Sequence, residues 1–155
     1  MRSLLLAATV LAVALTARSA SAQSTSDGPM LTATILVKAI ETSNIDLLLG
    51  AFDDEATVFM PFAGTPARLR GKAEIRQAFE SLFKTAPPTG GVRTITPREV
   101  ATQLFGDTAI VTFLLGDIPQ QPVQGRVVRG RRTLVLRRVQ DRWLIVHLHA
   151  SNVGG

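Results

Sequence analysis

The chain has 155 residues, with 17 lysines and arginines against 12 aspartates and glutamates, and it has no cysteine. This length supports one domain with one hydrophobic core. Without cysteine there can be no disulfide, thiolate catalysis or cysteine metal site, and the modest positive charge is not interleaved with aromatic residues as in nucleic-acid-binding proteins.

The first 22 residues have the three parts of a secretory signal peptide. Arg2 gives a positive start, the run LLLAATVLAVALT is apolar but short for a membrane span, and Ala20-Ser21-Ala22 offers small residues for cleavage. We predict a signal peptide over residues 1–22, cut after Ala22, and a periplasmic or secreted product that is free of the membrane. Cleavage would leave 133 of the 155 residues and would lower the formal charge from +5 to +3.

The segment QSTSDG, residues 23–28, is predicted to be a flexible leader before a domain over residues 29–155. Pro29 suits the first turn of a helix, and residues 30–42 continue it. The apolar stripe of this helix is expected to consist of Leu31, Ile35, Leu36, Ala39 and Ile40.

Two further helices are expected. A short one lies in NIDLLLGAF, with Asn44 as its N-cap. The clearest helix in the sequence covers residues 72–84, because its apolar residues fall on one face. They are Ile75, Ala78, Phe79, Leu82 and Phe83.

Strands are predicted before and after the third helix. The ranges are 56–62, a short extended piece at 68–70, and then about 92–104, 108–115, 125–139 and 142–151. Helices first and an antiparallel meander afterwards predict an α+β fold.

Three of these strands contain apolar residues in both alternating phases. They are AIVTFLL at 109–115, TLVL at 133–136 and WLIVHLHA at 143–150. A strand with one face in water alternates apolar and polar residues, so both faces of this sheet should be covered. The helices can cover one face only, and we therefore expect a homodimer through the other.

The order of elements, together with the segments FDDEATVFMPF, RLRGKAEIRQAFESLF and RRTLVLRRVQDRWLIVHLHAS, resembles the nuclear-transport-factor-2-like superfamily. Within it, the chain is most similar to the SnoaL-like branch (SgcJ/EcaC type), and its ending also resembles the association domain of calcium/calmodulin-dependent kinase. The resemblance covers nearly all residues after the signal peptide. It implies a cone-shaped α+β fold with a curved antiparallel sheet and three N-terminal helices, a pocket between them, and dimers through the sheet.

Both histidines, His147 and His149, lie in the last predicted strand. With strict alternation they share a face with Trp143 and Ile145, and we expect them to pack and form hydrogen bonds at an interface. Two alternatives stay open. One is a metal site, which would need a further carboxylate ligand, and the other is a general base. We predict no metal and no cofactor.

The other phase of that strand, with the strand before it, is expected to line the pocket. In the kinase association domain an arginine follows the second histidine and a second pocket arginine falls near Thr133. Here the first position is Ala150, so the resemblance does not extend to a carboxylate clamp made by those arginines. The expected lining suits a small, mostly apolar ligand and consists of Thr133, Val135, Val146, Leu148 and Ala150.

Acids and arginines give weaker signals. Asp53 and Asp54 are candidates for a catalytic base, although an acidic cluster after a helix is more typical of a solvated turn. The chain has no tyrosine, the oxyanion donor that ketosteroid isomerases on this fold use. The arginines of the region 126–138 are expected at exposed strand ends and edges.

Three functions remain open. The first is an exported dimeric protein whose pocket binds a small apolar molecule. The second is an enzyme of isomerase, cyclase or oxidoreductase type that transfers a proton in the pocket, with His147, His149, Asp53 or Asp54 as its base. The third is a self-association module.

Overall fold

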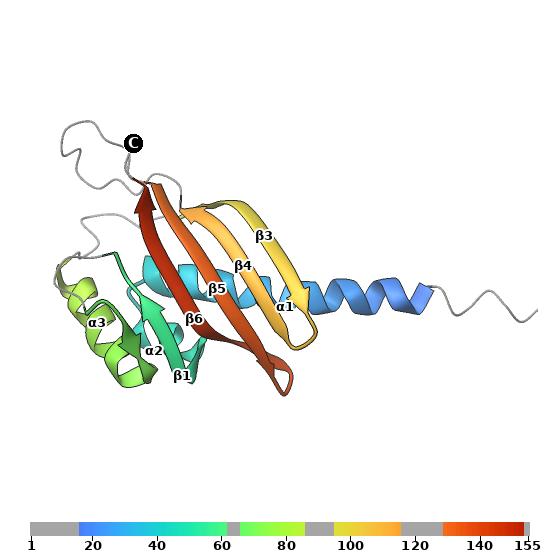
Figure 1. Cartoon of the computed structure of the whole chain (residues 1–155), viewed down its shortest axis with the longest axis horizontal. Helices are drawn as coiled ribbons and strands as arrows, with labels where there is room; N and C mark the ends of the chain where they lie inside the picture. The colour runs from blue at the N-terminus through green and yellow to red at the C-terminus, as the bar shows by residue number, and fades with distance from the viewer. Residues whose placement is uncertain (1–15, 62–65, 86–94, 116–128, 154–155) are drawn as a thin grey trace, which may run out of the picture.

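The computed structural model describes residues 16–61, 66–85, 95–115 and 129–153. Its helices are α1 (Thr16–Glu41), α2 (Ile45–Gly50) and α3 (Gly71–Thr85). Its strands are β1 (Phe52–Phe59), β2 (Leu69–Arg70), β3 (Pro97–Phe105), β4 (Thr108–Leu115), β5 (Arg129–Val139) and β6 (Arg142–Val153). The predicted α+β fold, with helices before an antiparallel meander, is confirmed (Figure 1).

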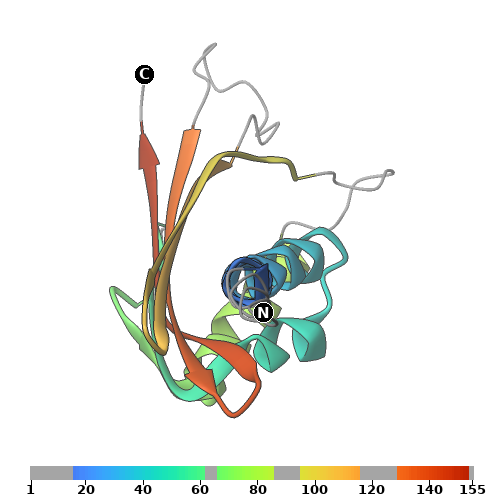
Figure 2. The same cartoon turned by 90° about the vertical axis from the view of Figure 1, so that its right-hand side faces the viewer.

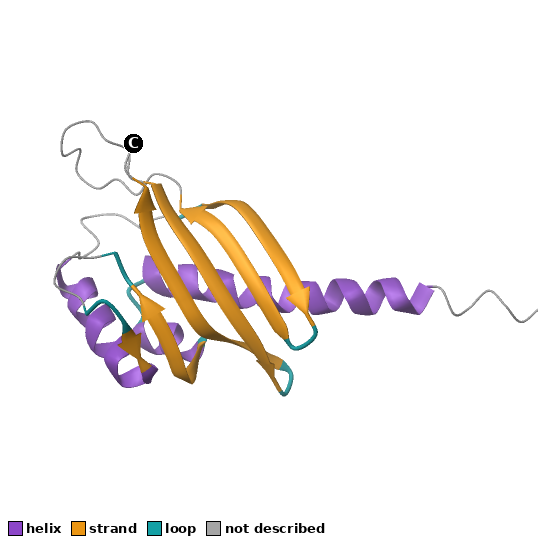
Figure 3. Ribbon diagram, in the orientation of Figure 1, coloured by secondary structure: helices purple, strands orange, loops and turns teal. Residues whose placement is uncertain are grey.

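The six strands form one curved sheet in the order β2-β1-β6-β5-β4-β3. The strands β3, β4, β5 and β6 make an antiparallel meander, and β1 joins β6 in parallel. All three helices lie on one side of the sheet (Figures 2 and 3). We call the side that faces the helices the inner face and the other side the outer face.

The hydrophobic core lies between the inner face and the helices. α1 packs against β3, β4 and β6, and α3 packs against β1 and β2. Residues directly opposite one another on neighbouring strands share a face, and the buried ones form continuous rows. The inner face of the meander includes Ala109, Val111, Phe113, Leu115, Leu134, Leu136, Ile145, Leu148 and Ala150, all buried.

A β-bulge at Val146 changes the face to which the side chains of β6 point. Ile145 pairs with Leu136 on β5, whereas His147 pairs with Val135, so Val146 has no partner opposite it. One extra residue in a strand reverses the alternation beyond it. Trp143 and Ile145 therefore lie on the inner face and His147 and His149 on the outer face, and the prediction that these four share a face was wrong.

Helix α1 differs from its prediction in extent and in its buried stripe. It begins at Thr16, so residues 23–28 are helical instead of forming an open leader, and Pro29 lies inside the helix. Proline inside a helix lacks the N–H that would bond to the preceding turn and its ring crowds that turn, yet the residues before and after Pro29 are helical. Leu31 is 61% exposed and lies off the buried stripe. Of the predicted stripe, Leu36 and Ala39 are buried, and Ile35 and Ile40 are partly buried. The buried residues of α1 are Pro29, Thr32, Ala33, Leu36, Val37 and Ala39.

Close approach joins α1 to β6. A Cβ on Gly28 would lie 2.5 Å from Cδ1 of the Trp143 ring, so the absence of a side chain lets the helix reach the strand. Thr32 Oγ1 donates a hydrogen bond of 2.8 Å to the carbonyl oxygen of Trp143. These contacts hold α1 against the first residues of β6, just before the bulge at Val146.

The remaining predicted elements are close to their observed bounds. The Asn44 side chain accepts a hydrogen bond from Leu47 N at 2.9 Å, which confirms the N-cap of α2. β4 has the predicted bounds and α3 is one residue longer at each end. β1 begins at Phe52, four residues before its predicted start, and ends at Phe59, before its predicted end. The predicted strand residues 92–94 and 125–128, and residues 1–15 of the predicted signal peptide, lie outside the described residues. Within the part described, no helix is long and apolar enough to cross a membrane.

Candidate functional site

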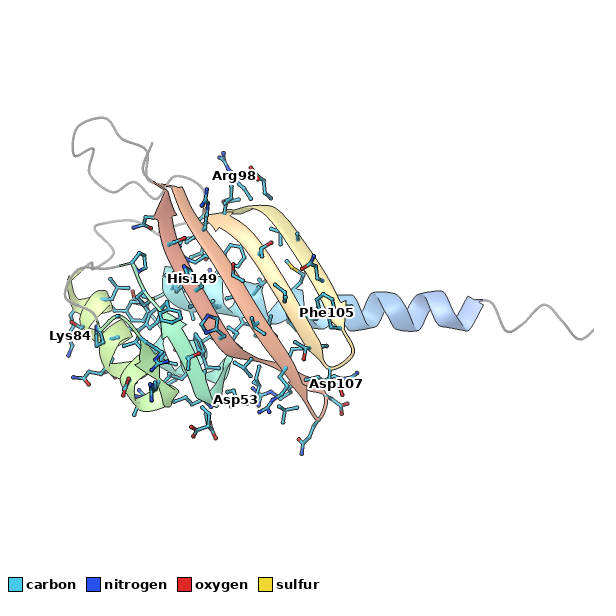
Figure 4. All side chains as sticks on the ribbon, in the orientation of Figure 1. Asp53, Lys84, Arg98, Phe105, Asp107 and His149 are labelled. Atoms are coloured by element: carbon cyan, nitrogen blue, oxygen red, sulfur yellow. The ribbon has the colours of Figure 1, made fainter. Side chains whose placement is uncertain are left out.

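The two histidines belong to a cluster on the outer face of the sheet. Thr57 Oγ1 and His147 Nδ1 are 2.7 Å apart and share a hydrogen bond. The ring of Phe59 meets the ring of His147 edge-on, with centroids 5.4 Å apart, and lies 5.9 Å from the ring of His149. Figure 4 shows His149 on β6, with α1 behind the sheet. The histidines therefore face away from the helices.

The environment of His147 keeps its imidazole neutral at neutral pH. Partial burial lowers the pKa of His147, and the neighbouring His149 lowers it further. A neutral imidazole with Thr57 bonded to Nδ1 has only Nε2 left for another partner. His147 therefore packs against Phe59 and forms a hydrogen bond, as predicted, and its place at an interface stays a prediction.

Asp53 lies in an ion pair that crosses β6. Its Oδ2 accepts a hydrogen bond of 2.9 Å from Arg137 Nη2, and its Oδ1 accepts one of 3.1 Å from the backbone of Glu55. The bond from the Glu55 backbone, followed by Arg137, lowers the pKa of Asp53 although partial burial opposes this. A carboxylate held in this way is a weak base, because its charged form is already stabilised.

Asp54 points away from the interior. Its side chain is 85% exposed and forms an ion pair of 2.7 Å with Lys72 on α3. Among the described residues, no hydrogen bond, ion pair or ring contact joins Asp53 or Asp54 to either histidine, so the structure does not assemble the four catalytic candidates into one site. Nor does the described part of the chain contain a group of three or more histidines, aspartates and glutamates that could hold a metal.

The residues predicted to line a pocket are divided between the two faces. Leu148 and Ala150 lie on the inner face and are buried. Thr133 and Val135 lie on the outer face, directly opposite His149 and His147. Val146 is the bulge residue. Thr133 and Val135 belong to the outward phase of β5, whose inward residues are Leu134 and Leu136, so the predicted phase of β5 was wrong. The bulge accounts for Val146 alone, because that residue stands outside the alternation of β6.

An arginine that the sequence analysis placed at an exposed edge lies on the inner face. Arg132 is directly opposite Phe113 on β4 and Ala150 on β6, which are both buried. Its Nη1 donates hydrogen bonds to the carbonyl oxygens of Arg131, at 2.8 Å, and Ser151, at 3.3 Å. Burial lowers its pKa to about 10, so it remains charged at neutral pH. The sequence contained a sign of this position: residues two apart on a strand share a face, and Arg132 alternates with the apolar residues Leu134 and Leu136.

Comparisons with known proteins agree with this architecture. Residues 32–154 match the model of the SnoaL-like domain. No curated protein matches the chain.

Several solved structures share the fold. A nuclear-transport-factor-2-like (NTF2-like) protein of unknown function from Pseudomonas putida KT2440 has a TM-score of 0.69 and 16% identity, over 83% of this chain and 87% of that one. The CaMKII hub of S. rosetta has a TM-score of 0.63 and 24% identity, over 83% and 96%. A protein of unknown function with a cystatin-like fold from Nostoc punctiforme PCC 73102 has a TM-score of 0.61 and 13% identity, over 81% and 89%.

Proposed function

The chain belongs to the SnoaL-like domain family, and from this premise we propose that it is an exported, dimeric protein that binds a small, mostly apolar molecule between its sheet and its helices. Leu148 and Ala150 of the predicted lining contribute to that inner wall. Thr133 and Val135 belong to the dimer face instead.

The observation that carries the proposal is the composition of the inner face where β5 begins and β6 ends. Phe113, Leu115 and Ala150 make this part of the face apolar. Asn152 is the next inner-face residue of β6 and is exposed, so solvent reaches the same end of the sheet. An apolar wall with few polar groups is typical of small-molecule sites.

The positions of the acid–base candidates favour binding over proton transfer. Both histidines lie on the outer face, Asp53 is held by Arg137, and Asp54 is exposed. A general base has to come within hydrogen-bonding reach of the proton that it removes. These side chains do not face the space between sheet and helices, and we therefore place isomerase, cyclase or oxidoreductase activity second.

The outer face supports self-association with a second copy. One row of directly opposed residues crosses four strands and consists of Thr57, His147, Val135 and Ile110. The next row consists of Phe59, His149, Thr133 and Thr112. Neither row contains an acidic residue, a lysine or an arginine, and the cores of protein interfaces are depleted of charged residues. The structural likeness to a CaMKII hub is in keeping with association through this fold.

Export follows from the predicted signal peptide. A cut after Ala22 would leave a chain that begins at Gln23, within α1. The contacts of Gly28 and Thr32 with Trp143 lie beyond the cut and would be retained. N-terminal sequencing of the protein recovered from the periplasm or the medium tests this step: a product that still begins at Met1 would contradict it.

Native mass spectrometry of the purified protein tests binding and assembly together. We expect a dimer that carries an organic mass. V135E, which places a charge in the centre of the outer face, should give a monomer, whereas V139E, at the exposed last residue of β5, should remain a dimer. A wild-type monomer at micromolar concentration would contradict the dimer. A dimer that carries no organic mass and binds none of a panel of apolar compounds would leave the self-association module as the function.

A further inference from the structure

Arg132 is the charged side chain in an apolar part of the inner face. Its neighbours across the sheet are Phe113 and Ala150, and its neighbour on the same face of β5 is Leu134, all three of them buried. A cation is disfavoured in such surroundings unless an anion or hydrogen-bond acceptors compensate for the lost water. The guanidinium of Arg132 therefore needs an anion or hydrogen-bond acceptors in place of the water that it has lost.

The guanidinium lies over Gly130 and uses only part of its hydrogen-bonding capacity. A Cβ on Gly130 would lie 2.9 Å from Nη1 and 3.1 Å from Nη2 of Arg132. Both described hydrogen bonds are donated by Nη1, to the carbonyls of Arg131 and Ser151. Within the described residues, Nε and Nη2 have no acceptor. These two nitrogens form one edge of the planar group, the fork that binds carboxylates side-on.

The described residues supply no carboxylate to this guanidinium. The ion pairs of the described aspartates and glutamates involve Lys38, Lys72, Arg76, Arg137 and Arg138. Only burial contributes to the lowered pKa of Arg132, whereas the carboxylate of a nearby acid would raise that pKa. In the part of the chain that the structure describes, Arg132 therefore has two carbonyl acceptors but no anionic partner.

We propose that Arg132 binds the carboxylate of the ligand, so that the small apolar molecule is an organic acid. This inference rests on the proposed function, because it assigns the anionic end of a molecule that occupies the same space. Access is available at the end of the sheet, where Asn152 stands opposite Gly130 and is exposed. A single guanidinium edge matches a monoanion, and the apolar side chains beside it suit a hydrocarbon body.

The test compares acids with neutral compounds of the same shape. Isothermal titration measures the binding of octanoate and 4-phenylbutyrate, and of octanamide and 4-phenylbutyramide, to the purified protein at constant ionic strength. We expect the acids to bind about tenfold or more tightly than the amides, the size of effect typical of a hydrogen bond to a charged group. R132M should abolish that difference.

Three further variants distinguish the effect of the guanidinium geometry on binding from the effects of positive charge and of misfolding. R131M removes the neighbouring arginine, which faces outward, and should leave the preference for acids unchanged. R132K keeps a positive charge but lacks the fork, and G130A displaces the guanidinium with a methyl group; both should reduce the preference. If circular dichroism shows that R132M is unfolded, the role of Arg132 is judged from the preference for acids over amides in R132K and G130A.

The outcomes distinguish this inference from the proposed function. Acids that bind more tightly than amides, with the preference lost in R132M, reduced in R132K and G130A, and kept in R131M, support the role of Arg132. Equal binding of acids and amides overturns it and leaves the apolar site in place. Failure of all four compounds to bind overturns both proposals. A preference for acids that R131M abolishes as fully as R132M would also overturn it, because general electrostatic attraction would then explain the binding.

Discussion

Ile145 and His147 are two residues apart on β6 and point to opposite faces of the sheet. Ile145 is fully buried beside Leu136, whereas His147 lies opposite Val135 and shares a hydrogen bond with Thr57. In a regular strand these two side chains would share a face. The extra residue Val146 therefore reverses the alternation: Trp143 and Ile145 face the helices before it, and Leu148 and Ala150 do so after it, which leaves His147 and His149 on the outer face.

Deletion of Val146 should prevent stable folding. Without the extra residue, either His147 and His149 or Trp143 and Ile145 must move to the wrong face, which places histidines in the core or apolar side chains in water. We expect a loss of more than about 3 kcal/mol in the free energy of unfolding, measured by urea denaturation. V146A keeps the bulge and is the control, with a smaller loss. A deletion variant as stable as V146A would contradict this role of the bulge.

Replacement of Gly28 by alanine should destabilise the protein although alanine favours helices. The new methyl group would meet Cδ1 of Trp143 at 2.5 Å, and overpacking of this kind typically reduces the free energy of unfolding by about 1–3 kcal/mol. G50A is the matched control, because a Cβ on Gly50 has no neighbour within 4 Å. Thermal denaturation of the two variants should therefore show a lower melting temperature for G28A alone. Equal melting temperatures would mean that α1 is not held against Trp143.

Acid should destabilise the protein in part through His147. Burial and His149 lower the pKa of His147 in the folded state below the ordinary histidine value of 6.5. As the pH falls through 6.5, the unfolded chain takes up the proton first, so the free energy of unfolding decreases until the folded-state pKa is passed.

The H147Q variant tests this assignment, because glutamine retains hydrogen bonding without titrating in this range. Urea denaturation between pH 7.5 and pH 5 should show a shallower decrease in the free energy of unfolding for H147Q than for the wild type. Parallel curves would assign the acid sensitivity to other groups.

Replacement of Arg132 by methionine should stabilise the unliganded protein. The guanidinium has no anionic partner among the described residues, and exchange of buried charges for apolar side chains of similar size is often neutral or stabilising by about 1–4 kcal/mol. We expect an increase near the lower end of this range in urea denaturation, because the side chain is only partly buried. A loss of stability in R132M would show that its bonds to the Arg131 and Ser151 carbonyls matter more than the cost of burial.

Local patterns in the sequence predicted most of the architecture. The apolar face of residues 72–84 predicted α3, Asn44 predicted the start of α2, and the run TAIVTFLL predicted β4. These elements depend on residues within a few positions of each other, so the sequence contains the information that decides them. The closing motif also identified the family correctly.

The candidate site was predicted less well, because its residues depend on register. Leu148 and Ala150 were assigned to the interior, where they lie, but Thr133 and Val135 were placed beside them although they face outward. Arg132 was assigned to an exposed edge. Periodicity shows which residues of a strand share a face but not which face that is, and for β5 the wrong face was chosen. The bulge in β6 affects Val146 and has no clear mark in the sequence.

The sequence by itself thus determined the class of fold, the order of its elements and the family, because helix faces, caps and strand alternation are local properties. Only the tertiary structure decided that Asp53 pairs with Arg137, that the histidines meet Thr57 and Phe59, and that Arg132 stands on the inner face. Those relationships join residues that lie far apart along the chain. They depend on how β1, β5 and β6 pair, and that pairing is set by the burial of the whole core and not by any one segment.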